Sequence, residues 1–254
     1  MDTKWDAQKY TKDFSFVHQY GNDVLKLIEI KPHFSALDLG CGNGALTKQL
    51  SAMGLHAMGM DASAELLEVA HRQYPDFQFF HGDATDFMLP AKVDIIFSNA
   101  VFHWIKKEKQ LQMLQCVYRA LNDKGQFVFE FGGSGNNALI HQALKVAFQE
   151  QGLSYQMPFY FPTIGEYASL LEQAGFKVTY AVLFDRLTTL NGPNGLSDWI
   201  QMFIKDPFAS IEAERRKKLI QRTTEQVRDT LYHEKKWYAD YVRIRMKAIK
   251  PTTR

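Results

Sequence analysis

This sequence is poor in cysteine and in long apolar runs, and its charges nearly cancel. Two cysteines in 254 residues are too few for a disulfide framework. No uninterrupted apolar stretch approaches the ~20 residues that a membrane-spanning helix needs, and the first residues, Met1–Trp5, lack the apolar core of a signal peptide. The formal net charge of +2 does not indicate a nucleic-acid-binding surface. We therefore expect a cytoplasmic protein that binds neither a membrane nor nucleic acid.

Short apolar runs alternate with amphipathic segments through the first half of the chain. This β-α-β order predicts an α/β fold in which a parallel sheet carries helices on both faces. Right-handed crossovers then bring the carboxyl ends of the strands to one edge of the sheet. The expected strands are 35–39, 56–60, 77–80, 93–97 and 126–131, and the expected helices between them are 44–53, 63–73 and 107–121.

The rest of the chain is expected to add helices and two further β segments. Ser63 and Gly175 are a plausible helix N-cap and C-cap. An amphipathic helix over 14–30 precedes the first strand, and Lys31-Pro32 ends it. The later segments are helices at 137–151 and 163–174, a β-rich run at 176–190, a helical stretch at 197–232 and a final strand at 238–249. We expect one α/β domain of 254 residues with a helical insertion late in the chain.

The most informative stretch is Asp38-Leu39-Gly40-Cys41-Gly42-Asn43-Gly44. It follows an apolar run and precedes an amphipathic segment, which indicates a strand, a glycine turn and a helix. Alternate glycines permit backbone angles and close approaches that a Cβ atom would prevent. Such a turn lets the main chain lie against a flat, polar cofactor at the end of a parallel sheet.

Two cofactors use such a turn, and the spacing favours one of them. Dinucleotide enzymes usually show G-x-G-x-x-G with a helix N-terminus facing the pyrophosphate. Here the spacing is G-x-G-x-G, and Asp38 stands two positions before the first glycine. S-adenosylmethionine has no phosphate, and its sulfonium and amino groups gain from a nearby carboxylate, directly or through water. The pattern therefore favours S-adenosylmethionine over NAD.

Three further elements follow the next three expected strands. Asp61 follows the second strand and can accept hydrogen bonds from both ribose hydroxyls, a feature that NAD enzymes share. Asp83 follows the third strand and can accept a hydrogen bond from an adenine amino group. The segment Phe97–Trp104 ends the fourth strand. All of these lie at the carboxyl edge of the sheet, where open α/β folds bind their ligands.

These residues together resemble the class I S-adenosylmethionine-dependent methyltransferases. The resemblance rests on Asp38–Gly44, Gly59–Ser63, Gly82–Ala84, Asn99–Trp104 and the turn Leu121–Phe127. It covers residues 10–190, and the remainder is similar in architecture only. The Asn-Ala-x-x-His-Trp form of residues 99–104 and the opening segment Trp5–Tyr10 are most similar to the branch that contains trans-aconitate methyltransferase.

The resemblance implies a doubly wound, mostly parallel sheet of seven strands whose last strand is antiparallel, together with a small helical cap. On this basis the chain divides into a lid helix (1–30), a cofactor-binding core (31–190), a cap (191–236) and a final strand (237–254). The glycines would approach the methionine moiety, and Asn99 would lie near the sulfonium. The residues expected to bind S-adenosylmethionine, or its product S-adenosylhomocysteine, are Tyr10, His18, Asp38, Gly40, Cys41, Gly42, Asn43, Gly44, Asp61, Ala62, Asp83, Ala84, Asn99 and Ala100.

Other chemically active residues have structural interpretations as well. His103 is a candidate general base, because an unperturbed histidine has a pKa of ~6.5, but it can equally line the wall or bond a backbone carbonyl. Trp104 more often packs under the sheet. Cys41 is expected to pack rather than to act as a nucleophile, and the basic cluster at 215–218 is expected to be a solvated helix face. No metal site is expected.

The acceptor of the methyl group is the open question. A carboxylate needs no base, and no conspicuous base besides His103 is expected at the carboxyl edge, so carboxylate methylation is mildly favoured. A small organic acid would require an arginine clamp, for which Arg186 and Arg243 are candidates. We expect a small-molecule substrate and a monomer. The alternatives are an NAD-dependent oxidoreductase and a cofactor-binding protein without catalysis.

Overall fold

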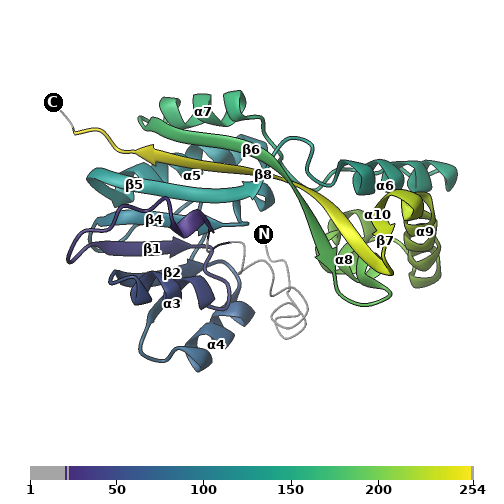
Figure 1. The fold of residues 1–254 in the computed structure, drawn as a ribbon, viewed down its shortest axis with the longest axis horizontal. Helices are drawn as coiled ribbons and strands as arrows, with labels where there is room; N and C mark the ends of the chain where they lie inside the picture. The colour runs from purple at the N-terminus through teal and green to yellow at the C-terminus, as the bar shows by residue number, and fades with distance from the viewer. Residues whose placement is uncertain (1–20, 22, 253–254) are drawn as a thin grey trace. The chain divides into compact units, whose positions relative to one another are not determined.

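The structure, a computed structural model, describes residue 21 and residues 23–252 (Figure 1). The chain is helical at 23–25, within the helix expected over 14–30. Most of the segment expected as that helix, and the expected cofactor contacts Tyr10 and His18, lie outside the described residues. Among the residues that are described, we find no helix that combines the length and apolar character needed to cross a membrane.

A mostly parallel sheet forms the centre of the protein. Its strands are β1 (Ser35–Leu39), β2 (His56–Asp61), β3 (Gln78–His81), β4 (Val93–Asn99), β5 (Leu121–Gly132), β6 (Lys177–Leu190), β7 (Tyr232–His233) and β8 (Lys236–Ile249). Seven strands follow the order β3-β2-β1-β4-β5-β8-β6, and β7 pairs with β8. The pairs β2–β3, β1–β2, β1–β4 and β4–β5 are parallel. This confirms the expected doubly wound sheet.

The late strand β8 runs antiparallel to β5. The amide of Lys124 donates to the carbonyl of Lys250, and the amide of Gly133 donates to the carbonyl of Val242. The residue numbers of β8 therefore fall as those of β5 rise, which is the pattern of an antiparallel pair. The expected last antiparallel strand is thus present.

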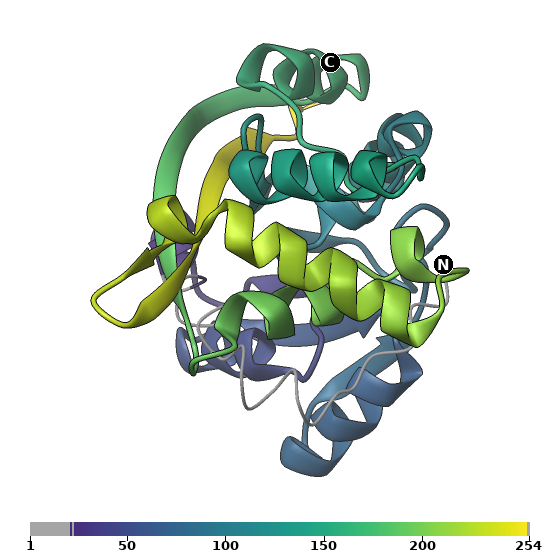
Figure 2. The ribbon, with the colours of Figure 1, turned by 90° about the vertical axis from the view of Figure 1, so that its right-hand side faces the viewer.

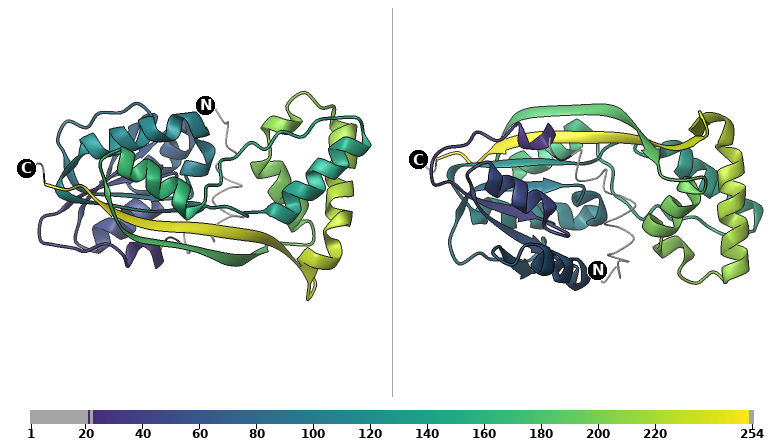
Figure 3. Two further views of the ribbon diagram at one scale, coloured as in Figure 1. Left: turned by 90° about the horizontal axis from the view of Figure 1, so that it is seen from above. Right: turned by 60° about the horizontal axis from the view of Figure 1, so that its bottom comes forward.

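The side chains of β5 alternate between the two faces of the sheet, and residues on both faces pack against helices. Val128 packs on one face in a cluster with Leu46 and Leu50 of α3 (Ala45–Ala52). Phe129 and Phe131 point the other way, and their ring centroids lie 5.5 and 4.9 Å from that of Tyr167 on α7 (Ile164–Gln173). The remaining helices of this part are α4 (Ala64–Gln73), α5 (Gln110–Ala120) and the 3₁₀ turns η1 (Phe102–Trp104) and η2 (Lys107–Lys109) (Figure 3).

The chain folds into two compact units. The first contains the described residues up to Phe131, with Pro162–Leu183 and the residues from Ile244 onward; the second contains Gly132–Phe161 and Phe184–Arg243. The second unit therefore includes more of the chain than the segment 191–236 expected as a cap. Its helices are α6 (Ala138–Glu150), α8 (Gly195–Phe203), η3 (Asp206–Phe208), α9 (Ala213–Gln226) and α10 (Arg228–Leu231).

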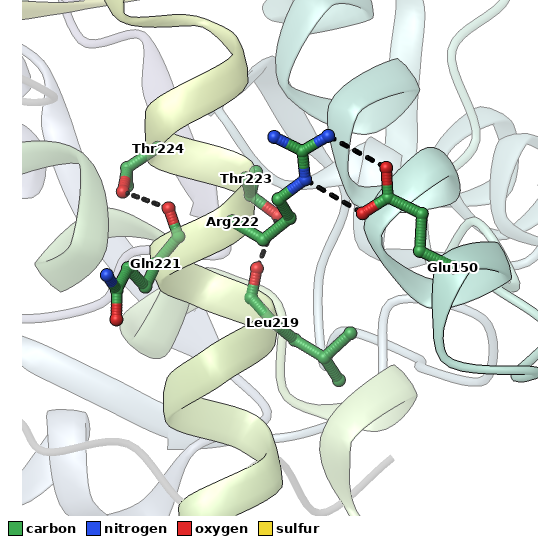
Figure 4. Close-up of polar contacts among 6 residues, drawn as sticks. All are labelled: Glu150, Leu219, Gln221, Arg222, Thr223 and Thr224. Carbon is green, nitrogen blue, oxygen red and sulfur yellow. Dashed lines mark hydrogen bonds and ion pairs between the residues drawn. The ribbon is translucent and has the colours of Figure 1, made fainter.

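Within the second unit, α6 and α9 lie side by side (Figure 2). The guanidinium of Arg222 on α9 binds both carboxylate oxygens of Glu150 on α6, at 2.8 Å each (Figure 4). The hydroxyl of Thr223 donates a 2.8 Å hydrogen bond to the carbonyl of Leu219, four residues earlier on the same helix. The basic residues at 215–218 are exposed, as a solvated helix face requires.

Candidate functional site

The glycine turn between β1 and α3 has the backbone geometry that its sequence predicts. Gly40, Gly42 and Gly44 have φ angles of 79°, 54° and 81°, which side-chain-bearing residues rarely adopt. A Cβ atom on Gly40 would lie 2.2 Å from Val101, and one on Gly44 would lie 2.7 Å from Phe79. Neighbouring side chains therefore enclose the first and third glycines of the turn.

Gly42 differs from its two neighbours because the space beside it is open. A Cβ atom there would meet its nearest neighbour, Leu66, at 3.9 Å. The amide of Gly42 donates a 2.7 Å hydrogen bond to Oδ2 of Asp61 at the end of β2. The turn therefore presents a bare stretch of main chain next to a carboxylate.

Two backbone amides fix the orientation of the Asp61 carboxylate. Besides the bond from Gly42, its Oδ1 accepts a 2.8 Å hydrogen bond from the amide of Ser63. Ser63 also caps α4, since its hydroxyl accepts from the amide of Leu66 at 3.2 Å, as the sequence predicts. Burial raises the pKa of Asp61, although its amide hydrogen bonds oppose this. Asp61 is a preoriented acceptor for hydroxyl groups.

Asp38 is deeply buried, with 1% of its surface exposed. Its Oδ2 accepts a 2.7 Å hydrogen bond from the hydroxyl of Thr47 on α3. Burial raises the pKa of Asp38 to about 7, against the opposing effect of that hydrogen bond. A cationic group placed beside Asp38 would therefore favour its ionised form.

Cys41 is buried in the turn and packs with Leu67, Ala70 and Phe79. Burial raises the pKa of its thiol, which leaves it in the neutral, poorly nucleophilic form at pH 7. The geometry agrees with the expected packing role.

Three other residues of the expected site lie in the turns after β1, β2 and β3. The side chain of Asn43 accepts a 3.3 Å hydrogen bond from the amide of Ala45 at the start of α3. The carbonyl of Ala62 lies 3.0 Å from Nε2 of His81. Ala84 follows Asp83 in the turn after β3.

Asp83 lies on the exposed side of the same edge. Its Oδ1 accepts hydrogen bonds from the amide of Thr85 at 2.7 Å and from its hydroxyl at 2.8 Å. Partial burial alone would raise the pKa of Asp83, but these two bonds together with nearby positive charge, including Lys109, outweigh it, so the pKa is lowered. Asp83 is therefore an ionised acceptor at pH 7.

The end of β4 turns sharply after the buried Asn99. Ala100 has a φ of 62°, in the left-handed region, and its amide donates a 2.7 Å bond to the carbonyl of Glu130 on β5. Such backbone strain in a residue with a side chain often marks a functional site. The next turn, η1, carries His103, whose ring is half-buried and stacks on Phe131 at 6.5 Å.

A buried amide that we did not predict holds this turn in place. The side-chain Nε2 of Gln110 donates to the carbonyls of Phe102 and Ile105, at 2.8 Å each. The hydroxyl of Tyr167 in turn donates to Oε1 of Gln110 at 3.1 Å, and both side chains are fully buried. A glutamine at the start of an amphipathic helix normally indicates a solvated position, so its sequence carried no sign of this role.

The strand register brings the expected site residues to one edge. Asp38 pairs with Gly59 on one side and Phe97 on the other, while Asn99 pairs with Glu130. The glycine turn, Asp61, Asp83 and Asn99 thus all follow carboxyl ends of parallel strands in the first unit. Arg186 and Arg243 belong to the second unit, where their guanidinium groups lie 5.0 and 5.5 Å from the rings of Phe184 and Tyr241.

Comparisons with known proteins agree with this geometry. Residues 36–125 match the methyltransferase domain family, and this range contains every described residue of the expected cofactor site. An uncharacterized methyltransferase of Schizosaccharomyces pombe is 28% identical over 267 residues, spanning 97% of this chain and 98% of that protein.

Two further comparisons concern part of the chain in one case and the fold alone in the other. A trans-aconitate 2-methyltransferase of Rhodopseudomonas palustris is 28% identical over 148 residues, which cover 58% of this chain and 57% of that enzyme. Phosphoethanolamine N-methyltransferase 2 of Haemonchus contortus, solved with S-adenosyl-L-methionine, has a similar fold, with a TM-score of 0.56 at 19% identity over 92% of this chain and 53% of that one.

Proposed function

Because this chain is a class I S-adenosylmethionine-dependent methyltransferase, we propose that it methylates a small molecule and that the methyl-accepting group is a carboxylate. The cofactor supplies an electrophilic methyl group on a sulfonium. The comparisons give no support to the alternative of an NAD-dependent oxidoreductase or to a protein without catalysis.

The open face of Gly42 beside Asp61 is the observation that carries the placement of the cofactor. A side chain at position 42 would fill space that the protein itself leaves free, and Asp61 is already aligned there by two amides. In our proposal the turn contacts the methionine moiety, and the Asp61 carboxylate accepts from the ribose hydroxyls. Asp38 supports the cationic end of the cofactor, directly or through water.

The remaining residues complete the proposed site. Asp83, an ionised acceptor, receives the adenine amino group, and the strained turn at Asn99 and Ala100 lies beside the sulfonium end. The backbones of Cys41, Asn43, Ala62 and Ala84 line the same edge. Tyr10 and His18 stay a prediction as lid contacts, since they lie outside the described residues.

Two observations support a carboxylate acceptor. The relatives that match part of this chain include trans-aconitate 2-methyltransferases. A carboxylate is also ionised at pH 7, since its ordinary pKa is ~4, and so needs no base. His103, whose ring packs on Phe131, then serves as a wall of the site. The protein's main contribution is to hold carboxylate and methyl group in line, which is worth on the order of 7 kcal/mol.

Transfer of a labelled methyl group tests this proposal. The purified protein would be incubated with labelled S-adenosylmethionine and a panel of trans-aconitate, other di- and tricarboxylic acids, phenols and amines. We expect base-labile methyl esters of one or more acids. Label transferred to phenols or amines and to none of the acids would refute the carboxylate assignment.

A glycine substitution tests the placement of the cofactor. Gly42→Ala adds a methyl group to the open face, and Gly152→Ala is its matched control, with a φ of 68° and no atom within 4 Å of its Cβ position. Both variants should lose ~1–2 kcal/mol of stability from the left-handed backbone. We expect at least about tenfold weaker S-adenosylhomocysteine binding for Gly42→Ala alone, because its methyl occupies the space that the cofactor needs. Equal affinities in both variants would contradict the placement.

A further inference from the structure

A buried ion pair joins two strands of the first unit near the carboxyl edge of the sheet. The side chain of Glu130, on β5, is fully buried, and that of Arg245, on β8, is 13% exposed. The guanidinium binds Oε2 of Glu130 through Nε at 2.8 Å and through Nη2 at 2.7 Å. The arginine is therefore held in a fixed direction by a carboxylate that solvent does not reach.

The strand register places this pair beside the proposed cofactor site. Glu130 pairs with Asn99 on β4, while Asp38 on β1 pairs with Phe97, two positions before Asn99. Because the side chains of a strand alternate between the two faces, those of Asp38, Asn99 and Glu130 share one face of the sheet. Arg245 lies on that face as well, since its side chain contacts Glu130. All of these residues belong to the first unit.

The backbone of Glu130 also supports the strained turn that follows β4. Its carbonyl accepts the 2.7 Å hydrogen bond from the amide of Ala100, whose φ is 62°. Its side chain binds the guanidinium of Arg245. A single residue therefore fixes the position of that guanidinium relative to the turn that we place beside the sulfonium.

Stability alone is a weak reason for such a pair. The desolvation of two charges offsets most of their attraction, and apolar residues of similar size often replace a buried pair without loss of stability. A guanidinium at a ligand-binding edge has a second use, because its planar shape matches a carboxylate. The arginines that the sequence offers for this role, Arg186 and Arg243, belong to the second unit, whereas Arg245 belongs to the unit that contains the cofactor site.

The strand order indicates which carboxylate Arg245 is placed to bind. With neighbouring strands ~4.8 Å apart, β8 lies about 10 Å from β4 and about 14 Å from β1. The carboxylate of the cofactor stands beside its amino group, which we place at Asp38 on β1. The acceptor has to approach the methyl group at the sulfonium end, beside Asn99 on β4. Arg245 is therefore closer to the acceptor than to the amino-acid end of the cofactor.

We propose that Arg245, positioned by Glu130, binds a carboxylate of the methyl acceptor that does not itself react. This inference deepens the proposed function and rests on it, because it takes the acceptor to be a small acid. It adds that the acceptor carries at least two carboxylates. One of them faces the methyl group, and the other binds the guanidinium and so holds the first in line.

Two variants test this role. Glu130→Gln/Arg245→Met removes both charges together, so that no unpaired charge stays in the interior. Arg245→Lys keeps a cation beside Glu130 but lacks the planar guanidinium, and it decides the question if the double variant does not fold. The matched control is Glu29→Gln/Lys247→Met, which removes a 2.6 Å ion pair on the same face of β8, two positions farther from the carboxyl edge.

The probes are trans-aconitate and crotonate, an unsaturated acid with a single carboxylate. We expect kcat/KM for trans-aconitate to fall at least about tenfold in the double variant and about threefold in Arg245→Lys, because a hydrogen-bonded charge pair is lost or weakened. The value for crotonate, the affinity for S-adenosylhomocysteine by calorimetry and the melting temperature should stay close to those of the wild type. In the control all of these should stay unchanged.

Three results would overturn the inference. They are an unchanged kcat/KM for trans-aconitate in a folded test variant, an equal loss with crotonate, and a loss of affinity for S-adenosylhomocysteine, which would assign Arg245 to the cofactor's own carboxylate. A wild type that methylates crotonate as well as trans-aconitate would also overturn it, while the proposed function would stand.

Failure of the proposed function gives a different result. If the wild type methylates no carboxylic acid as a carboxylate, para-hydroxybenzoate is compared with phenol, and β-alanine with ethylamine, in the same variants. A loss confined to the acceptor that carries a carboxylate would support the role of Arg245 without the proposed function. Equal rates for both members of a pair would overturn that role too.

Discussion

The pH dependence of cofactor binding offers a sharp test of the role of Asp38. This carboxyl is almost fully buried, and burial raises its pKa to about 7. In our proposal it supports the cationic end of the cofactor, so it must ionise to bind well. With a pKa of about 7, its ionised fraction rises from about one tenth at pH 6 to about nine tenths at pH 8. The affinity for S-adenosylhomocysteine, which carries the same amino group, should therefore increase about tenfold over this range.

The variant Asp38→Asn separates the pH dependence due to Asp38 from that due to the nearby Asp61. Asp61 also has a raised pKa, and its contribution remains in the variant. Asparagine has nearly the same shape and keeps an oxygen that can accept from Thr47. We expect the variant to bind the cofactor more weakly at pH 8 and to show a clearly smaller change in affinity between pH 6 and pH 8 than the wild type. Calorimetric titrations at several pH values measure this, and an unchanged tenfold pH dependence in the variant would refute the reasoning.

The same pKa makes a prediction for stability without cofactor. The pKa of Asp38 in the folded protein, about 7, lies above its value of ~3.9 in the unfolded chain, so folding takes up a proton between these values. The free energy of unfolding should therefore fall as the pH rises from 4 to above 7, by on the order of 4 kcal/mol from this group. At pH 8, Asp38→Asn should melt at a higher temperature than the wild type. A lower melting temperature at pH 8 would show that the ionised carboxylate stabilises the fold.

Two further predictions concern stability away from the site. Lys250 is buried and donates to the carbonyls of Tyr118 and Leu121, at 3.0 and 2.8 Å, where α5 ends. Lys250→Met should therefore lower the free energy of urea unfolding by about 2 kcal/mol. The control Lys177→Met, at an exposed position, should change it by less than ~0.5 kcal/mol. Equal effects would contradict the role of Lys250 in binding the carbonyls at the end of α5. Arg222→Gln removes the exposed ion pair of Figure 4 and should shift the midpoint of urea unfolding no more than Lys177→Met does, because solvent screens the pair. A shift as large as that of Lys250→Met would refute this.

The part of the fold that follows from the sequence is the part that local patterns specify. β1 has the bounds predicted for it, and β2 and β3 are within one residue of theirs, because short apolar runs were bounded by glycine and polar turns. The turn at Gly40–Gly44 was predictable for the same reason. Parallel pairing then brings Asp38, Asp61 and Asn99 to one edge, as the β-α-β order implies.

What could not be predicted depends on contacts between distant residues or on unusual turns. The β7–β8 hairpin closes on Glu234 and Lys235, both left-handed at 50° and 61°, without the glycine or asparagine that normally signals such a turn. The hydrogen bonds of Gln110 depend on residues that the fold brings beside it, and its position on the helix alone resembles that of a solvated residue. Asn137 is similar, because its helix is capped by Asp240, more than a hundred residues later.

A crystal structure of the protein with S-adenosylhomocysteine tests the central claim most directly. Our account predicts that the methionine part lies against the open face of Gly42 and that both ribose hydroxyls donate to Asp61. It also places the adenine amino group at Asp83 and the sulfur near Asn99. A cofactor bound away from the carboxyl edge, or one that leaves Asp61 bonded to Gly42 and Ser63 alone, would contradict it.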